Sequence, residues 1–151
     1  MKYKELTERI IGCSMTVHNT LGNGFQEVIY QRALSIEMNV EGIEHTREFE
    51  MPIYYRSQHI GTRRVDFLVE GHISVEIKAV SELNDTHMAQ GINYLEAYNL
   101  ETGLLINFGA NKLQFKRLFN NKFKPEQPNQ PIEKDQIEEV LSLKSFNPLK
   151  S

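Results

Sequence analysis

The chain has 151 residues, of which 40% are apolar and 25% are charged, and its formal net charge is −3. This length predicts one domain with a sizeable core. A single cysteine, Cys13, excludes an internal disulfide and a zinc site built from several thiolates, and we expect a reducing, cytoplasmic setting. No apolar run is long enough to span a bilayer, and residues 1–10 do not resemble a signal peptide. The negative charge gives no indication of nucleic-acid binding.

The first third of the sequence predicts two helices. Apolar residues recur at helical spacing over 4–20, and the turn LGNG at 21–24 interrupts the pattern. A second helix is predicted over 25–41, with Gly42 as its end. Cys13 lies on the apolar stripe of the first helix, where we expect a small buried hydrophobe.

Strand patterns dominate from residue 44 to residue 119, with one helix among them. Runs rich in β-branched and aromatic residues predict three strands, then a helix with Asn84 or Asp85 as its N-cap, then two more strands. The order helix, helix, three strands, helix, strand, strand is typical of an α/β protein whose helices pack on one sheet. The predicted ranges are strands 44–55, 58–70 and 72–80, helix 85–98, and strands 102–109 and 112–119.

The composition changes beyond Asn120. Four of the five prolines lie there, and the segment KPEQPNQP cannot hold regular structure. Residues 132–143 predict one short helix that docks on the core or on a partner. We therefore divide the chain into a domain over 1–120 and a Pro-rich tail over 121–151.

Three charged residues interrupt the predicted hairpin VDFLVEGHISVEIK. Val65, Phe67 and Val69 share one face of the first strand, and Ile73, Val75 and Ile77 share one face of the second. When both apolar sets are placed on the same side, Val69 lies opposite Ile73 across a three-residue turn. This register places Asp66 opposite Glu76, with β-carbons about 4.5–5.5 Å apart. Lys78 follows about 6.6 Å further along the same face. Two carboxylates and an ammonium group therefore converge.

Opposed carboxylates repel each other and need a compensating positive charge. Lys78, Arg63, Arg64 or a divalent cation could supply it, and Mg²⁺ or Mn²⁺ suits hard oxygen ligands at this separation. A nearby lysine would then orient water or stabilise charge at a phosphate. The alternative is an exposed hairpin face whose charges are simply solvated. The residues alone leave both interpretations open.

The spacing of these charges resembles the (P)D-X(n)-(D/E)-X-K signature of the PD-(D/E)XK nuclease superfamily. Asp66 is followed by nine residues and then by Glu76, Ile77 and Lys78. Val65 stands where the signature often has Pro, which is a departure from the pattern.

Two further motifs extend the resemblance from about Leu6 to Leu118. Downstream, Gln90 and Tyr94 lie on one face of the predicted helix and resemble the QxxxY element of the RecB and phage-exonuclease branch. Upstream, GFQEVIY is similar to the GxxExxY signature of a family of small bacterial proteins placed in this superfamily. That signature falls on Gly24, Glu27 and Tyr30.

The resemblance implies a restriction-endonuclease-like core of order αβββαβ, with a mixed central sheet flanked by helices. It implies hydrolysis of phosphodiester bonds with Mg²⁺ or Mn²⁺, with Asp66, Glu76 and Lys78 as catalytic residues. The implied metal ligands are Glu27, Asp66, Glu76 and the backbone carbonyl of Ile77. Gln90 and Tyr94 would contact the nucleic-acid backbone or buttress the site.

Several of these residues also have structural interpretations. Glu27 is also explained as a solvated glutamate near a helix N-terminus. Tyr30 is better explained as a core residue. For Gln90 and Tyr94, a place in the wall of the active site and a packing role are equally favoured. His87 on the same helix could be a general base, but a helix-surface position is favoured.

The main functional alternative is a catalytically silent module that keeps the nuclease fold and binds nucleic acid or protein. For the enzyme, DNA is favoured over RNA as the substrate. The sequence does not distinguish single-stranded from double-stranded substrates, or exonuclease from endonuclease activity. No membrane partner is expected. Proteins of this kind often act as homodimers or with a helper protein.

Overall fold

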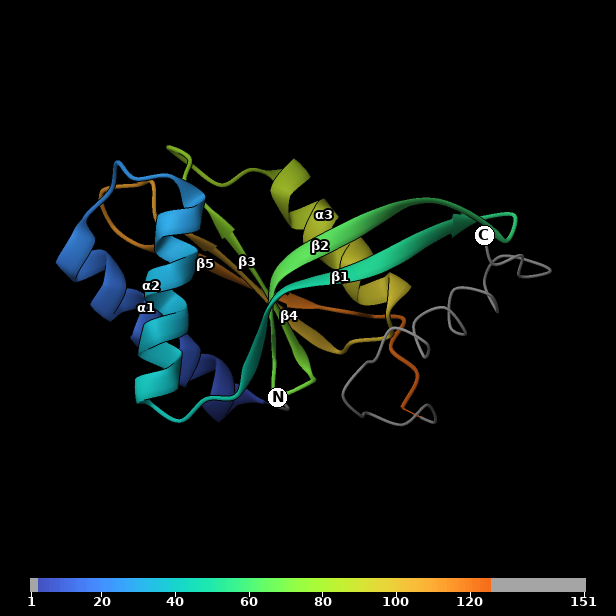
Figure 1. The fold of residues 1–151 in the computed structure, drawn as a ribbon, viewed down its shortest axis with the longest axis horizontal. Helices are drawn as coiled ribbons and strands as arrows, with labels where there is room; N and C mark the ends of the chain where they lie inside the picture. The colour runs from blue at the N-terminus through green and yellow to red at the C-terminus, as the bar shows by residue number, and fades with distance from the viewer. Residues whose placement is uncertain (1–2, 126–151) are drawn as a thin grey trace.

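The computed structural model describes residues 3–125. Its order of helices and strands confirms the α/β prediction (Figure 1). The helix predicted over 132–143, and the tail beyond Pro125, lie outside the described residues. No helix in the described part of the chain has both the length and the apolar character needed to cross a membrane. The elements are α1 (Lys4–Leu21), α2 (Glu27–Val40), β1 (His45–Tyr55), β2 (Gln58–Val69), β3 (Ile73–Lys78), α3 (Asp85–Ala97), β4 (Thr102–Asn107) and β5 (Gln114–Phe119).

The turn between α1 and α2 is held by a tyrosine. Gly22 and Gly24 have φ angles of 70° and 112°, which glycine adopts without steric cost. The Tyr30 hydroxyl donates to the Gly22 carbonyl oxygen at 2.6 Å and accepts from the Phe25 N–H at 3.2 Å. Its ring is fully buried and stacks on Phe108, with centroids 4.7 Å apart. The core interpretation of Tyr30 is confirmed, and this residue fixes how α2 begins.

The five strands form one mixed sheet in the order β1-β2-β3-β4-β5. Neighbouring strands are antiparallel except β3 and β4, which are parallel and connected through α3. The β2–β3 hairpin has the predicted register, with Val69 opposite Ile73 and Phe67 opposite Val75. The hydrophobic alternation was therefore sufficient to align these two strands.

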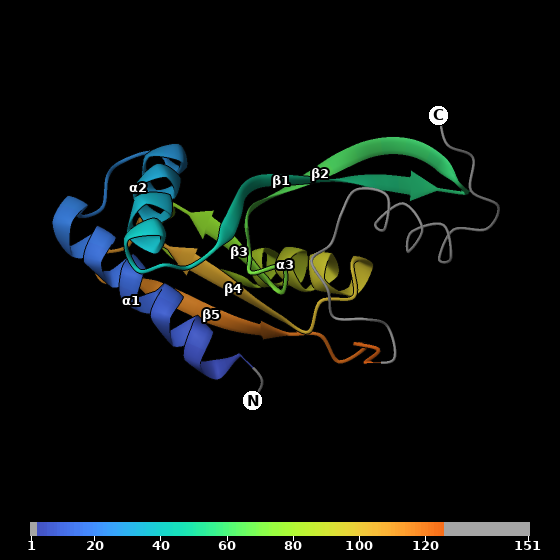
Figure 2. The ribbon, with the colours of Figure 1, turned by 60° about the horizontal axis from the view of Figure 1, so that its bottom comes forward.

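Both faces of the central sheet are buried. The ribbon shows α1 and α2 on the other side of the sheet from α3 (Figures 1 and 2). Leu104 and Ile106 of β4 belong to the core formed with α1 and α2. Leu105 belongs to a second core, formed with α3. All six residues of β4 are buried, which confirms that this apolar strand is covered on both sides.

The β1–β2 ribbon leaves the sheet near Asp66. The β2–β3 ladder ends at Phe67, and Glu48, which the register places opposite Asp66, has a φ of 55° and interrupts the β1–β2 pairing. Beyond this fork the ribbon runs over α3 (Figure 2). Val65, predicted on the same face as Phe67, instead packs in the second core with Tyr94. That expectation was wrong because the strand twists at the fork.

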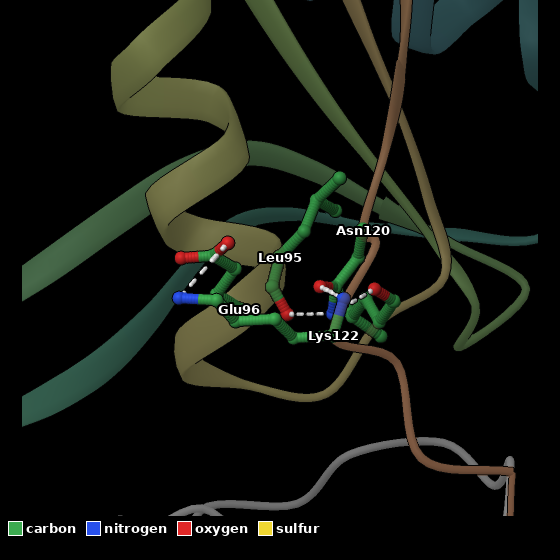
Figure 3. Close-up of polar contacts among 5 residues, drawn as sticks. Leu95, Glu96, Asn120 and Lys122 are labelled. Atoms are coloured by element: carbon green, nitrogen blue, oxygen red, sulfur yellow. Dashed lines mark hydrogen bonds and ion pairs between the residues drawn. The ribbon is translucent and has the colours of Figure 1, made fainter.

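Polar side chains hold both ends of α3. At its start, Asn84 Oδ1 accepts from the His87 N–H at 3.0 Å, and His87 Nδ1 accepts from the Asn84 N–H at 3.2 Å. At its end, Asn120 donates from one amide group to the carbonyl oxygens of Leu95 at 3.1 Å and Leu100 at 3.0 Å (Figure 3). The helix is therefore fastened to the segment that follows β5.

We expect Gly109→Ala to lower the free energy of unfolding by about 1–3 kcal/mol, as overpacking does. A β-carbon at Gly109 would lie 2.4 Å from both the backbone nitrogen and the oxygen of Val80. Backbone atoms cannot turn aside as a flexible side chain can. Gly61→Ala is the matched control, because nothing lies within 4 Å of its added β-carbon. Equal stability of the two variants in chemical denaturation would contradict this packing.

Candidate functional site

Asp66 fills the gap that opens where β2 leaves β3. Its Oδ2 accepts a hydrogen bond from the Ile77 N–H at 2.7 Å, and its Oδ1 accepts one from Gln31 Nε2 at 2.8 Å. A diverging strand leaves backbone groups without a ladder partner, and a buried unpaired N–H is costly. Asp66 therefore completes the sheet at the fork, and its carboxylate is held from two sides.

The backbone carbonyl of Ile77 is directed to the same side of β3 as Asp66. Within a strand, the N–H and the C=O of one residue point toward the same neighbour. The Ile77 N–H points at the Asp66 carboxylate, so the Ile77 carbonyl oxygen also faces the fork. This places a third oxygen donor beside the two expected carboxylates.

Glu76 is a largely buried carboxylate on the face of β3 that α3 covers. Its side chain is 12% exposed. Helix α3 passes close to it at Gly91, where an added β-carbon would lie in ordinary contact distance, 4.0 Å from Glu76 Oε1. Burial raises the pKa of Glu76 above its ordinary value, and the Asp66 carboxylate adds to this, whereas Arg63 and Lys78 lower it. The net rise means that the charged form of Glu76 is costly and depends on cationic partners.

Two cations flank Glu76. Arg63 Nη2 lies 2.9 Å from Glu76 Oε1. Lys78 follows two residues along the same face of β3, where it is half-buried, and its charge also favours the carboxylate. Arg64 turns to the other side of the ribbon and pairs with the exposed Glu48 at 3.3 Å. Of the two neighbouring arginines, the fold therefore brings only Arg63 to the carboxylates.

Helix α3 forms the wall on which Arg63 rests. The Arg63 guanidinium carbon lies 5.3 Å from the centroid of the fully buried Tyr94 ring. Burial raises the pKa of Tyr94, and the neighbouring Tyr98 adds to this, so the Tyr94 ring remains neutral. Gln90, one turn earlier on the same helix, is exposed. The burial of Tyr94 favours a buttressing role over contact with a ligand.

Gln31 is the site residue that sequence reasoning missed. It is buried, and its Oε1 has no hydrogen-bond partner within residues 3–125, although its Nε2 holds Asp66. Gln31 lies one helical turn after Glu27, so both side chains leave the same face of α2. That i, i+4 spacing was the signal available in the sequence. Glu27 itself is exposed at the start of α2.

The oxygens at the fork suit a hard divalent cation. Within the described range 3–125, no group of three or more His, Cys, Asp or Glu side chains is placed to hold a metal, so Glu27 does not complete such a group. Mg²⁺ and Mn²⁺ commonly take only one or two carboxylates and fill their other positions with water and phosphate oxygens. Asp66, Glu76 and the Ile77 carbonyl meet that requirement, and the unpartnered Gln31 Oε1 offers a polar atom to a bound water.

The comparisons with known proteins agree with this fold. Residues 4–118 match a family model described as the PD-(D/E)XK nuclease superfamily. The crystal structure of SSO0001 superposes with a TM-score of 0.50 and 16% sequence identity, covering 92% of this chain and 65% of that one. At that identity the likeness concerns the fold alone, and this chain spans only part of the other protein's length. No curated protein matches the chain.

In metal-free buffer we expect Glu76→Gln to be more stable than the wild type at neutral pH, with the difference shrinking as the pH falls. A carboxyl group with a raised pKa binds protons more readily in the folded state. The wild type therefore gains stability as the pH falls through that raised pKa toward the ordinary value of 4.5. Glutamine resembles the neutral form at every pH.

Thermal melts of both proteins from about pH 8 to about pH 4 test this linkage. Glu5→Gln, which alters an exposed carboxylate in α1, is the control for a general change in net charge. A Glu76→Gln difference that stays constant or grows as the pH falls would contradict the buried, charge-costly state of Glu76.

Proposed function

The chain belongs to the PD-(D/E)XK nuclease superfamily, and from that membership we propose that it is a Mg²⁺- or Mn²⁺-dependent nuclease that hydrolyses phosphodiester bonds, in DNA rather than RNA. One observation carries the proposal: Asp66 is held at the fork by the Ile77 N–H and Gln31. Glu76 and Lys78 stand beside it on one face of β3. These three residues are the ones whose spacing in the sequence resembles the superfamily signature, and this agreement supports the proposal.

The proposed metal ligands are Asp66, Glu76 and the Ile77 carbonyl, with Glu27 acting through a water from the same face of α2. A bound divalent cation supplies Lewis acidity and lowers the pKa of a coordinated water. The protein holds the ligand oxygens in place before the cation binds. The two hydrogen bonds to Asp66 do so, because they leave its carboxylate little freedom to rotate.

Lys78 is proposed to act on the reacting phosphate or on the attacking water. Its ammonium group donates three hydrogen bonds and carries a point charge, so it can orient a water or stabilise negative charge that develops on phosphate oxygens. Its position two residues after Glu76 keeps it on the same face of the strand. Gln90 is exposed one turn from Tyr94 and is proposed to contact the nucleic-acid backbone, while Tyr94 supports the site from beneath.

We also propose that the chain is a member of the GxxExxY group within the superfamily. The motif has a physical basis here, because Gly24 adopts a φ of 112° and the Tyr30 hydroxyl closes the turn before α2. Together they set the direction of the first turn of α2, which carries Glu27. Action as a homodimer or with a helper protein belongs to the same proposal.

We expect Glu76→Ala and Lys78→Met to reduce Mn²⁺-dependent cleavage at least about 100-fold, the scale of losing one charged group from the site. The substrates are labelled linear single-stranded DNA, double-stranded DNA and RNA. Glu5→Ala, an exposed glutamate on α1, is the matched control and should cleave like the wild type.

Two other results would contradict the proposal. Cleavage that persists in purified Glu76→Ala would show that the activity does not use this site. No cleavage by the wild type, together with a rise in its melting temperature in Mn²⁺, would favour the silent binding module, since a ligand of the native state stabilises it without turnover.

A further inference from the structure

Arg63 occupies the side of Glu76 where a cation is needed. Its Nη2 lies 2.9 Å from Glu76 Oε1, and the two side chains are 26% and 12% exposed. The guanidinium also lies over the Tyr94 ring at 5.3 Å. Such a group is held by a partly buried ion pair on one side and an aromatic face on the other.

The neighbouring arginine shows that this placement is particular to Arg63. Arg64 pairs with Glu48 at 3.3 Å, and these side chains are 58% and 39% exposed. An exposed pair of that kind contributes little to stability and is screened by salt. The two arginines are adjacent in β2, carry the same charge, and differ mainly in whether they face the fork.

The charges at the fork balance without a metal ion. One carboxylate, Asp66, and two cations, Arg63 and Lys78, act on Glu76, so that two negative charges are matched by two positive ones. A divalent cation bound to the same carboxylates would add two positive charges and leave a surplus. Positive charges that gather around the same carboxylates repel each other strongly where water is largely excluded. One of the two side-chain cations then has to leave its carboxylate or gain an anionic partner.

We propose that Arg63 and the divalent cation compete for Glu76 Oε1, so that metal binding releases the guanidinium to bind a phosphate oxygen of the substrate. Arg63 is the cation that can leave, because its contact with the Tyr94 ring keeps a place for it beside the site after the ion pair opens. Its planar fork of donors suits a phosphate. The phosphate half of this proposal rests on the proposed nuclease function, and the competition half does not.

The competition is tested by titrating Mn²⁺ alone into the wild type, Arg63→Met and Arg64→Met by calorimetry. When a competing contact must open first, the apparent Kd rises in inverse proportion to the open fraction. We expect Arg63→Met to bind Mn²⁺ about tenfold more tightly than the wild type, and Arg64→Met to change the Kd less than about twofold. The tightening should persist at about 0.5 M salt, where repulsion through solvent is screened.

A second readout is stability. Arg63→Met should melt below the wild type in chelator, because Glu76 loses its partner, and should match the wild type at saturating Mn²⁺, because the pair is then already open. An unchanged or weakened Mn²⁺ affinity would overturn the proposal and show that Arg63 and the metal use separate oxygens of Glu76. If Arg63→Met does not fold, Arg63→Gln, which removes the charge but leaves a polar side chain at this partly buried position, is judged by the same criterion.

The phosphate half is tested with a nuclease-resistant phosphorothioate oligonucleotide. In saturating Mn²⁺, we expect Arg63→Met to bind it about tenfold more weakly than Arg64→Met does. Equal affinities would overturn this half and leave the competition standing. Absence of oligonucleotide binding by the wild type would instead count against the proposed function, which separates the two failures.

Discussion

The hydrogen bond from the Ile77 N–H to Asp66 is the interaction on which the site depends. Without it, the end of the β2–β3 ladder would leave a buried backbone donor unpaired. The Asp66 carboxylate accepts from this N–H, and the hydrogen bond fixes the orientation of the carboxylate. The pairing that the sheet requires and the metal-binding role proposed for Asp66 therefore fall on one side chain, and a substitution at Asp66 cannot remove one without disturbing the other.

The electrostatics of the fork follow from this geometry. Diverging strands open a partly solvated gap, and α3 with the β1–β2 ribbon closes most of it again. Glu76 is consequently buried enough for its pKa to rise while it still has a cationic partner at 2.9 Å. Buried carboxylates held this way cost stability. Such a cost is common where ligand binding rather than folding is the selected property.

The sequence predicted the hairpin register correctly because alternation of apolar residues is a local pattern that a strand must satisfy. It did not predict the fork, since alternation says nothing about where two strands stop pairing. The misplacement of Val65 has the same origin. Gln31 was missed for a different reason: its i, i+4 spacing from Glu27 becomes informative only when the opposing strand is known.

The choice between Arg63 and Arg64 was also beyond sequence reasoning. The two are adjacent and chemically identical, and only the twist of β2 at Asp66 decides which one faces Glu76. By contrast, strand geometry predicted Glu76 and Lys78 on one face of β3. Asp66 was predicted opposite Glu76, but it lies one residue beyond the last pair of the β2–β3 ladder, Phe67 with Val75, and accepts from the Ile77 N–H instead. Roles for these residues remain predictions that the experiments above address.

The attachment of α3 to the segment after β5 bears on where this folding unit ends. The family match stops at residue 118, yet Asn120 supplies the donors for the Leu95 and Leu100 carbonyls. Two more hydrogen bonds join Asn99, just after α3, to the backbone of Lys124 in the segment after β5. A chain shortened to the limits of the family match would leave the end of α3, and with it the wall under Arg63, without its fastening. The hydrogen bonds that hold the end of α3 therefore come from residues past the limit of the family match.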